Sequence, residues 1–431
     1  MQESIILKEM MKTERVQEHI DKADEKGLNT KLLKDLCYPE NRKRWVTLIL
    51  QGKYHIFPSH AALIPKDEKG KFRTVYICED LDRIFLSLAN DVFCELFKSM
   101  IHKNCVSYQR GSSTQKVVKQ VSNEIVRLGK IKNHIGYKTD FEKYFDFLKI
   151  EKIDSIFDEM EKRVGLEKGT DPVINVIREY YHLNLYFDEY GNVCEKYCGI
   201  KQGSATSSFL SNAALYELDE FMSNKYSIYT RYCDDCICID ENTDEIINDM
   251  NRIIAPYGIR LNPKKVEPLY SDRWFKFLGF NIKRSMITLS KTRVKKFQRE
   301  IEKRTIDIKK KRKNYTSKQA RKSVIRFLYE GEFSWATSCL GVINVESDIQ
   351  ELNKFIMDCI RACDTGKLKV GGLGSVNYLD DRTILRGRGR NVKANRKKTD
   401  KIENYLSVKC LSNDLKICKE VFDAAVRNMK G

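Results

Sequence analysis

The chain has 431 residues, of which 78 are Lys or Arg and 60 are Asp or Glu, so its formal net charge is +18. This length allows two or three domains with a sizeable core, and the excess of cations favours a polyanionic partner, most simply nucleic acid. The sequence has no apolar run of about 18 residues and no basic start followed by an apolar core, which argues against a membrane span and a secretory signal and favours a cytoplasmic protein.

Residues 1–60 carry apolar side chains at loosely helical spacing and predict an N-terminal helical extension. Residues 64–77 predict a β-hairpin with its turn at 67–70. The cations of this hairpin include Lys66, Lys71 and Arg73. Such cations can clamp a triphosphate, but they can equally form the ordinary polar face of a strand.

Residues 80–101 show an amphipathic pattern that predicts a helix, and another helix is expected from residue 115 onwards. Residues 134–141 predict a strand with Asp140 near its end, followed by the aromatic pair Tyr144 and Phe145. An Asp in this place commonly caps the next helix, and an aromatic pair is commonly core. A carboxylate at a strand end is also well placed to meet the turn of a neighbouring hairpin. Residues 150–185 predict helices.

Residues 199–208 form a loop rich in Gly and Ser that contains Gln202 and Gly203 and leads into an apolar helix. Glycine lets a ligand approach the backbone closely, and a helix N-terminus favours anions, although this loop alone is a weak indication. Residues 227–240 are more informative, because two runs of β-branched and aromatic residues flank Asp234 and Asp235. They predict a hairpin with both carboxylates at its tight turn. Adjacent carboxylates repel each other unless a cation relieves them, so this is either a metal site or a solvated turn.

The rest of the chain is basic. Lys264 and Lys265 follow a turn, and residues 274–280 predict a short aromatic strand. Residues 291–322 are dense in Lys and Arg with a thin apolar stripe, which suits a helical stretch that lies along a phosphate backbone or a solvated surface helix. Helices are expected again over 323–365, and a second basic segment at 386–398 follows a glycine-rich break at 371–374.

The 14 cysteines lie mostly within apolar runs, where a reduced thiol behaves as a small hydrophobic side chain. Cys194 and Cys198 are four residues apart, as are Cys359 and Cys363, but no His or second Cys pair nearby completes a zinc pattern. We therefore expect reduced thiols in a reducing compartment and no structural zinc.

Taken in order, these motifs resemble a reverse transcriptase. The resemblance rests on the cationic hairpin, the Asp-x-x-x-aromatic-aromatic strand end, the Gln-Gly-Ser loop, the Tyr-Cys-Asp-Asp hairpin, a lysine after a turn, a Phe-Leu-Gly strand and a basic helix. It covers residues 64 to 322 and implies an α+β, right-hand polymerase fold. The implied domains are an N-terminal helical extension (1–60), fingers (61–135), a palm with an antiparallel sheet and a helical fingers insertion at 150–185 (136–285), a basic helical thumb (286–370) and a C-terminal basic and helical extension (371–431).

The resemblance also implies roles for single residues of the palm. Asp140 and Asp234 match the two metal-binding aspartates of that family, and Asp235 matches the carboxylate beside them. Phe141 would lend its carbonyl oxygen to a metal ion, and Phe145 matches the aromatic gate that excludes a ribose 2′-hydroxyl.

Further roles concern the nucleotide and the primer. Gln202 and Gly203 match the loop that contacts the incoming nucleotide and the template, and Arg73, with Lys66 or Lys71, matches the fingers cations on the triphosphate. The lysine near the leaving pyrophosphate is matched by Lys265, with Lys264 as a close competitor. The primer-grip strand is matched by Leu278 and Gly279.

The implied reaction is DNA synthesis from dNTPs on an RNA template, with an RNA/DNA hybrid as the bound nucleic acid. Such phosphoryl transfer uses two Mg²⁺ ions about 3.5–4 Å apart, and carboxylates on adjacent strands are the hard oxygen ligands that Mg²⁺ prefers. The three aspartates disfavour a non-catalytic RNA-binding scaffold, and Phe145 and Tyr232 favour DNA over RNA synthesis, which leaves an RNA-dependent RNA polymerase as the rival within this chemistry.

Smaller features separate the groups of reverse transcriptases. Ala205 stands where group II intron enzymes usually have proline, and the Asn-Ala-x-x-His and Val-Thr-Gly signatures of retron enzymes are not evident, since Asn212 lies in the helix of the glycine loop. The chain resembles bacterial defence-associated reverse transcriptases of the type 2 group in three features. These are its size, the Cys in the Tyr-Cys-Asp-Asp box and a C-terminal region of its own. That resemblance implies antiphage defence and a dedicated noncoding RNA as template and partner; retron and group II intron-like enzymes are the alternatives. The sequence indicates no oligomeric state.

Overall fold

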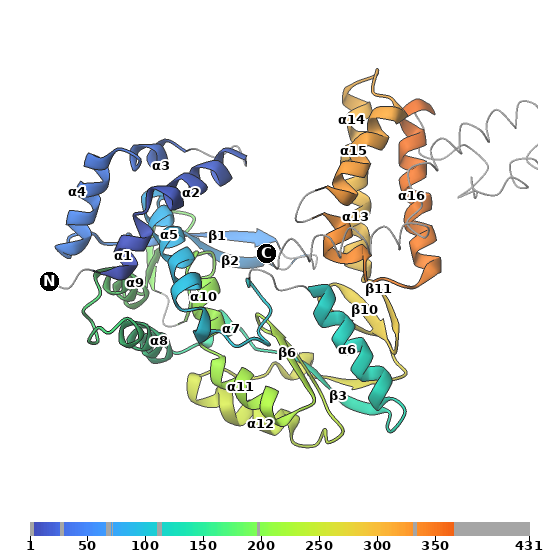
Figure 1. The fold of residues 1–431 in the computed structure, drawn as a ribbon, viewed down its shortest axis with the longest axis horizontal. Coiled ribbons are helices and arrows are strands. Elements are labelled where there is room, and N and C mark those ends of the chain that lie inside the picture. The colour runs from blue at the N-terminus through green and yellow to red at the C-terminus, as the bar shows by residue number, and fades with distance from the viewer. Residues whose placement is uncertain are drawn as a thin grey trace, which may run out of the picture. The chain divides into compact units, whose positions relative to one another are not determined.

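The structure is a computed structural model that describes residues 4–25, 30–65, 70, 72–109, 114–195, 199–330 and 334–365. The chain forms two compact units, Met1–Arg110 with Gly136–Pro268 and Gly111–Ile135 with Leu269–Gly431 (Figure 1). Lys66, Lys71, Cys198 and the predicted C-terminal extension at 371–431 lie outside the described residues. None of the helices in the described ranges has the length and apolar character needed to cross a membrane.

Helices make up most of the first unit. Its N-terminal helices are α1 (Ile5–Met10), α2 (Thr13–Glu25), α3 (Lys31–Asp35) and α4 (Pro39–Leu50), so this part of the chain is helical as predicted. The helices that follow are α5 (Asp80–Leu96), η1 (Lys98–Met100), α7 (Tyr144–Phe147), α8 (Ile150–Arg163), α9 (Pro172–His182), α10 (Ser207–Ala213), α11 (Tyr216–Lys225), α12 (Ile246–Ile254), η2 (Ala255–Tyr257) and η3 (Pro263–Lys265).

Two four-stranded sheets accompany these helices. One has the order β2-β1-β4-β5 and contains β1 (Ser59–Pro65), β2 (Phe72–Ile77), β4 (Leu185–Phe187) and β5 (Val193–Glu195). The predicted hairpin is therefore present, with Ile64 opposite Arg73 in an antiparallel pair. The other sheet has the order β6-β7-β3-β8 and contains β3 (His134–Asp140), β6 (Ile228–Tyr232), β7 (Asp235–Ile239) and β8 (Glu267–Tyr270).

Helix α5 is the centre of the core of the first unit. Acidic residues in its first turn, Asp80 and Asp82, suit the positive end of the helix dipole. Its apolar stripe is buried, and Phe85 has no exposed surface and meets Trp45 edge-on at 5.9 Å between ring centroids. Burying one such ring contributes about 1.5–3 kcal/mol, so this stripe joins the N-terminal helices to the rest of the unit.

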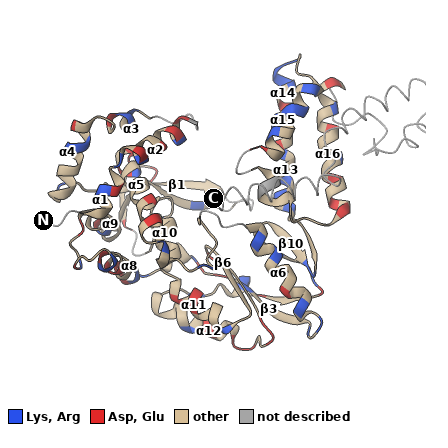
Figure 2. Cartoon of the chain, in the orientation of Figure 1, with Lys and Arg blue, Asp and Glu red and all other residues tan. Residues whose placement is uncertain are grey.

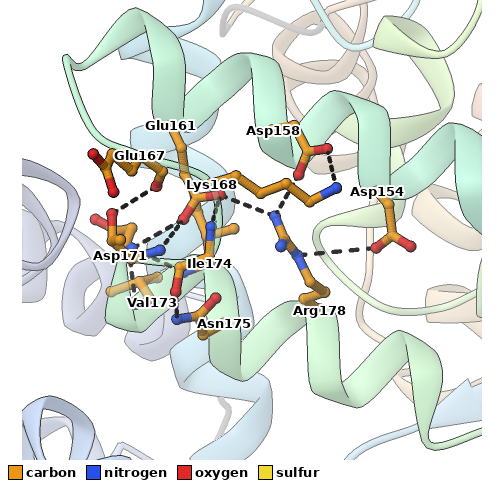
Figure 3. Close-up of polar contacts among 12 residues, drawn as sticks. Asp154, Asp158, Glu161, Glu167, Lys168, Asp171, Val173, Ile174, Asn175 and Arg178 are labelled. Carbon is orange, nitrogen blue, oxygen red and sulfur yellow. Dashed lines mark hydrogen bonds and ion pairs between the residues drawn. The ribbon is translucent and has the colours of Figure 1, made fainter.

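A buried carboxylate organises the connection between α8 and α9 (Figure 3). Glu161 has no exposed surface and accepts hydrogen bonds from the backbone N–H groups of Gly169, Thr170 and Asp171, at 2.8, 2.9 and 2.9 Å. Arg178 completes the set with Nη2 at 2.9 Å from Glu161 Oε2. The charge of Glu161 is thus balanced by one guanidinium and three amides, which is how a protein tolerates a buried carboxylate.

The second unit combines a helix from the middle of the chain with a small sheet and a group of helices. Its elements are α6 (Thr114–Leu128), β9 (Phe275–Phe277), β10 (Phe280–Lys283), β11 (Met286–Leu289), α13 (Lys291–Arg304), α14 (Ile306–Lys311), α15 (Ser317–Tyr329), η4 (Ala336–Leu340) and α16 (Glu346–Thr365). The sheet order is β11-β10-β9. Cys359 and Cys363 lie on α16 as buried thiols, with Cys363 Sγ 3.5 Å from the Cys359 carbonyl oxygen.

Two sequence expectations for this unit were too simple. The aromatic strand predicted over 274–280 is a hairpin, because Leu278 and Gly279 have φ of 49° and 81° and reverse the chain between β9 and β10. The single basic helical stretch predicted over 291–322 is divided among α13, α14 and α15. Lys and Arg side chains mark all three of these helices (Figure 2).

Candidate active site

The hairpin of β6 and β7 places two carboxylates at its turn. Tyr232 is paired with Asp235, so the loop between the strands consists of Cys233 and Asp234 alone. Cys233 has a φ of 55°, and a positive φ at the first loop position is what a tight type II′ turn requires. A residue other than glycine in this conformation costs about 1–3 kcal/mol, so the surrounding contacts must hold the turn.

Strand β3 brings the third carboxylate to the same place. It pairs antiparallel with β7 along its length, from Gly136 opposite Ile239 to Asp140 opposite Asp235. Because directly opposed residues of adjacent strands lie about 4.5–5.5 Å apart, Asp140 and Asp235 are neighbours across the sheet. The residue after β3, Phe141, is bridged to Leu261, and the Asp140 carbonyl accepts a hydrogen bond from Asn262 N at 2.8 Å.

Charge is poorly compensated at the turn. Burial and the charges of Asp140 and Asp235 raise the pKa of Asp234 to about 6. Lys265 lies at the end of η3, and its Nζ is 2.7 Å from Asp140 Oδ2. This contact favours Lys265 over Lys264 as the lysine of the site. Burial lowers the pKa of Lys265, but the hydrogen bond to Asp140 and the charges of the aspartates outweigh burial, so its pKa is raised. The Lys265 ammonium group therefore interacts with the charges of all three aspartates.

Replacing Asp234 by Asn should stabilise the protein in a chelating buffer. In the unfolded chain the carboxyl titrates near 3.8, and in the folded chain at about 6. Above pH 6 the folded state therefore bears the cost of a buried charge, which is relieved as the pH falls towards 4. We expect Asp234→Asn to raise the free energy of unfolding by about 2–3 kcal/mol at pH 8 and by little at pH 4.

Denaturant unfolding of both proteins at several pH values would measure this difference. Added Mg²⁺ should shrink it, since a cation stabilises the charged carboxylate of the wild type. Equal stabilities at pH 8 without divalent ions would contradict the charge repulsion inferred at the turn.

Backbone hydrogen bonds hold the glycine loop, residues 199–208, against helix α7 and strand β2. Gly199 has a φ of 89°, and a Cβ there would lie 2.0 Å from the Phe145 carbonyl oxygen, which accepts a hydrogen bond from Ile200 N. At the other end, Gln202 O accepts a hydrogen bond from Tyr76 N at 2.7 Å, and Gly203, with a φ of 108°, packs against the same backbone. The loop therefore connects the strand β2 with α7.

The aromatic residues after Asp140 differ in exposure. Phe141 and Tyr144 are buried, with ring centroids 5.6 Å apart, and the Tyr144 hydroxyl donates to the Ser211 carbonyl oxygen at 2.5 Å. Phe145 is partly exposed and lies 5.5 Å from Tyr144. Of this aromatic pair, Phe145 is thus the residue with solvent-accessible surface.

The remaining predicted residues are less closely connected to the aspartates. Arg73 is exposed on β2, opposite Ile64, and its side chain can reach solvent. Its expected partners Lys66 and Lys71 lie outside the described residues. Leu278 and Gly279 form a turn of the second unit.

The three aspartates have the ligand chemistry that magnesium prefers, although their side chains are not arranged as an assembled metal site. Across the described residues, no group of three or more His, Cys, Asp or Glu side chains is arranged to hold a metal ion. The three aspartates nevertheless offer hard oxygen atoms at one sheet end, and the raised pKa of Asp234 marks negative charge that a cation would relieve. Asp140, Asp234 and Asp235 are therefore suitable Mg²⁺ ligands.

A polar network that no sequence motif predicted lies beside the turn. Arg231 is fully buried and forms an ion pair with Asp219 at 2.6 Å, and Ser107 and Asn212 join it through further hydrogen bonds. Burial lowers the pKa of Arg231, but Asp219 outweighs burial and raises it. A signal was present in the sequence, because Asn212 interrupts an apolar run that includes Leu210 and Ala213.

Comparison with known proteins gives a family match and distant structural similarities. A family model described as "Reverse transcriptase (RNA-dependent DNA polymerase)" matches residues 64–282. Among solved structures, telomerase from Candida albicans in complex with a TWJ fragment of telomeric RNA is similar at 13% identity and a TM-score of 0.46, covering 91% of this chain and 66% of that one. Apo telomerase from Candida tropicalis is similar at 14% identity and a TM-score of 0.44, covering 90% and 70%.

An insertion loop deletion mutant of the RNA-dependent RNA polymerase of a human picorbirnavirus is similar at 14% identity and a TM-score of 0.45, covering 82% of this chain and 64% of that one. The chain thus spans about two thirds of the length of these polymerases. No curated protein matches it.

Proposed function

Since the chain belongs to the reverse transcriptase (RNA-dependent DNA polymerase) family, we propose that it synthesises DNA from dNTPs on an RNA template. The observation that carries this proposal is the register that sets Asp140 opposite Asp235, with Asp234 in the adjoining turn. A scaffold that only binds RNA gains nothing from three carboxylates at one sheet end, where burial and the charges of Asp140 and Asp235 raise the pKa of Asp234 to about 6.

Two Mg²⁺ ions held by Asp140, Asp234 and Asp235 would stabilise the attacking and leaving oxygens of the displacement. Phe141 is proposed to add its carbonyl oxygen to this set. Lys265 is proposed to act near the leaving pyrophosphate, which its ion pair with Asp140 supports. Preorganised positive charge at that point stabilises charge that develops in the transition state.

Substrate selection is proposed to rest on the residues around α7. Phe145 would block a ribose 2′-hydroxyl, and the backbone of Gln202 and Gly203, fastened to β2, would hold the nucleotide and template. Arg73, together with Lys66 or Lys71, would bind the triphosphate. Exposed lysines on α13, among them Lys291, Lys295 and Lys296, suit the phosphates of a bound RNA/DNA hybrid (Figure 2).

The template is proposed to be a dedicated noncoding RNA, and the biological role antiphage defence. What supports this is the Tyr-Cys-Asp-Asp box, Ala205 in place of the proline usual in group II intron enzymes, and the absence of retron signatures. A retron-like or group II intron-like role is the alternative.

Primer extension with the purified chain tests the reaction. The dNTPs and the rNTPs should each be tested on an RNA template and on a DNA template. Every combination should be run in the presence and in the absence of Mg²⁺. We expect Mg²⁺-dependent dNTP incorporation on RNA. Incorporation of rNTPs alone would favour the RNA-dependent RNA polymerase, and no incorporation of either would contradict a polymerase. Sequencing the nucleic acids that copurify would identify the template.

A further inference from the structure

The guanidinium of Arg231 is fully buried and contacts four oxygen atoms. Its side chain has no exposed surface. Two contacts go to Asp219, from Nε at 2.7 Å and from Nη2 at 2.6 Å. The same Nη2 lies 3.1 Å from the Asn212 carbonyl oxygen, and Nη1 donates to the Cys233 carbonyl oxygen at 3.0 Å. The ion pair therefore reaches into the turn that carries Asp234.

The other backbone group of Cys233 is also held by a side chain. Cys233 N donates to Ser107 Oγ at 3.0 Å, and the Ser107 hydroxyl donates to Asn212 Oδ1 at 2.9 Å. Asn212 returns a hydrogen bond from Nδ2 to the Ser107 carbonyl oxygen at 2.9 Å. Both the N–H and the C=O of Cys233 are thus fixed by residues that have little exposed surface. This matters because Cys233 has a φ of 55°, a conformation that persists only where its surroundings determine it.

The same network connects the turn with the predicted aromatic gate. Helix α10 ends with Asn212 and Ala213, and besides a capping hydrogen bond from Leu215 N at 3.4 Å the Asn212 carbonyl is contacted by a side chain from outside the helix. The Asn212 carbonyl accepts from Arg231, and the neighbouring Ser211 carbonyl accepts from Tyr144 at 2.5 Å. One helix end therefore sets the position of the turn and of the residue next to Phe145.

A merely stabilising role explains these contacts poorly. Buried ion pairs are often replaceable by apolar side chains of similar volume without loss of stability, so the pair with Asp219 is weak evidence for a contribution to folding. The planar fork of arginine can bind Asp219 with two nitrogens and still direct the third at a carbonyl oxygen. Lysine has the charge but lacks this fork.

We propose that Arg231 is a positioning residue, which acts through the Cys233 carbonyl, with Ser107 on the Cys233 amide, to hold Asp234 where it can bind a divalent cation. The expected effect of Arg231 on catalysis rests on the proposed function. The structural content of the inference, the link from Arg231 to metal affinity, can be measured without turnover.

The test compares Arg231→Lys and Ser107→Ala with the wild type. Arg231→Lys keeps the charge beside Asp219 and loses the fork, whereas Ser107→Ala keeps the ion pair and releases the Cys233 amide. Arg178→Lys is the matched control, because Arg178 forms an ion pair with the buried Glu161 in the same unit at 2.9 Å but belongs to α9 (Figure 3). Mn²⁺ binding would be followed by electron paramagnetic resonance without substrate, alongside the melting temperature, kcat and the KM for dNTP.

We expect both network variants to weaken Mn²⁺ binding about 10-fold and to lower kcat about 100-fold, with the KM for dNTP within about twofold of the wild type. Arg178→Lys should lower the melting temperature and leave Mn²⁺ binding unchanged. If Arg231→Lys does not fold, Ser107→Ala decides. Network variants with the Mn²⁺ affinity and kcat of the wild type would overturn the inference, whatever their melting temperature. A wild-type chain that makes no DNA would contradict the proposed function, while the Mn²⁺ titration would still decide the role of Arg231.

Discussion

Replacing Asp234 and Asp235 together by alanine is expected to abolish DNA synthesis, with a loss of about 10⁴-fold or more in kcat. Asp235 faces Asp140 across β3 and β7, and Asp234 adjoins it in the turn, so the double substitution removes two of the three carboxylates. Binding of a primer-template should persist, because the exposed lysines of α13 are untouched and the net charge becomes more positive. Primer extension and fluorescence anisotropy would measure the two properties separately.

Asp240→Ala provides the matched control at the other end of the same hairpin. Asp240 Oδ2 accepts hydrogen bonds from Ser227 N and Ser227 Oγ, both at 2.8 Å. Losing them should cost about 1 kcal/mol of stability and leave metal-dependent synthesis intact. If the double variant still incorporates dNTPs in a Mg²⁺-dependent way, the proposed role of Asp234 and Asp235 as metal ligands is wrong.

Replacing Phe145 by alanine is expected to let the enzyme accept ribonucleotides, with a change of about 100-fold in the ratio of dNTP to rNTP incorporation. The Phe145 backbone is held by Ile200 N, and its ring lies 5.5 Å from the buried Tyr144. We propose that the volume of this ring excludes a ribose 2′-hydroxyl. Removing the ring leaves room for that hydroxyl. Single-nucleotide incorporation with matched dNTP and rNTP would give the ratio.

Tyr144→Phe is the control that keeps the Phe145 ring and removes only a hydrogen bond of the neighbouring residue. This substitution deletes the hydrogen bond to the Ser211 carbonyl and keeps the ring. It should lower stability by about 1 kcal/mol and leave the dNTP to rNTP ratio as in the wild type. A Phe145→Ala variant that still rejects rNTPs as strongly as the wild type would show that another residue discriminates the sugar.

The sequence was most informative where the signal is local. Alternating β-branched and aromatic residues around Asp234 and Asp235 predicted the hairpin, and the family match confirms the α+β polymerase fold that the ordered motifs implied. The strand that ends at Asp140 was expected to meet this hairpin, but the residue-by-residue pairing of β3 with β7 stayed open, because register between strands that are distant in sequence depends on tertiary packing.

Other features were beyond a sequence pattern for identifiable reasons. The choice between Lys264 and Lys265 depends on side-chain direction in η3, where Asn262 fixes the turn by accepting from Lys264 N at 3.1 Å. The turn at Leu278 was missed because a positive φ is uncommon at a leucine. Arg231 was overlooked because an arginine on a short strand is ordinarily solvated, and its burial depends on Asp219 from another element.

The connectivity of the sheet β6-β7-β3-β8 has a consequence for the order in which the site can form during synthesis. Asp140 ends β3 and its partner Asp235 begins β7, with α7 to α11 and the glycine loop between them along the chain. A nascent chain that has not yet reached β7 therefore contains the first carboxylate without the strand that pairs with it. Loop closure over so long a segment carries an entropic cost that only the packed helices can repay. The proposed metal ligands can thus meet only after β7 has been synthesised, so a chain interrupted before β7 cannot assemble them.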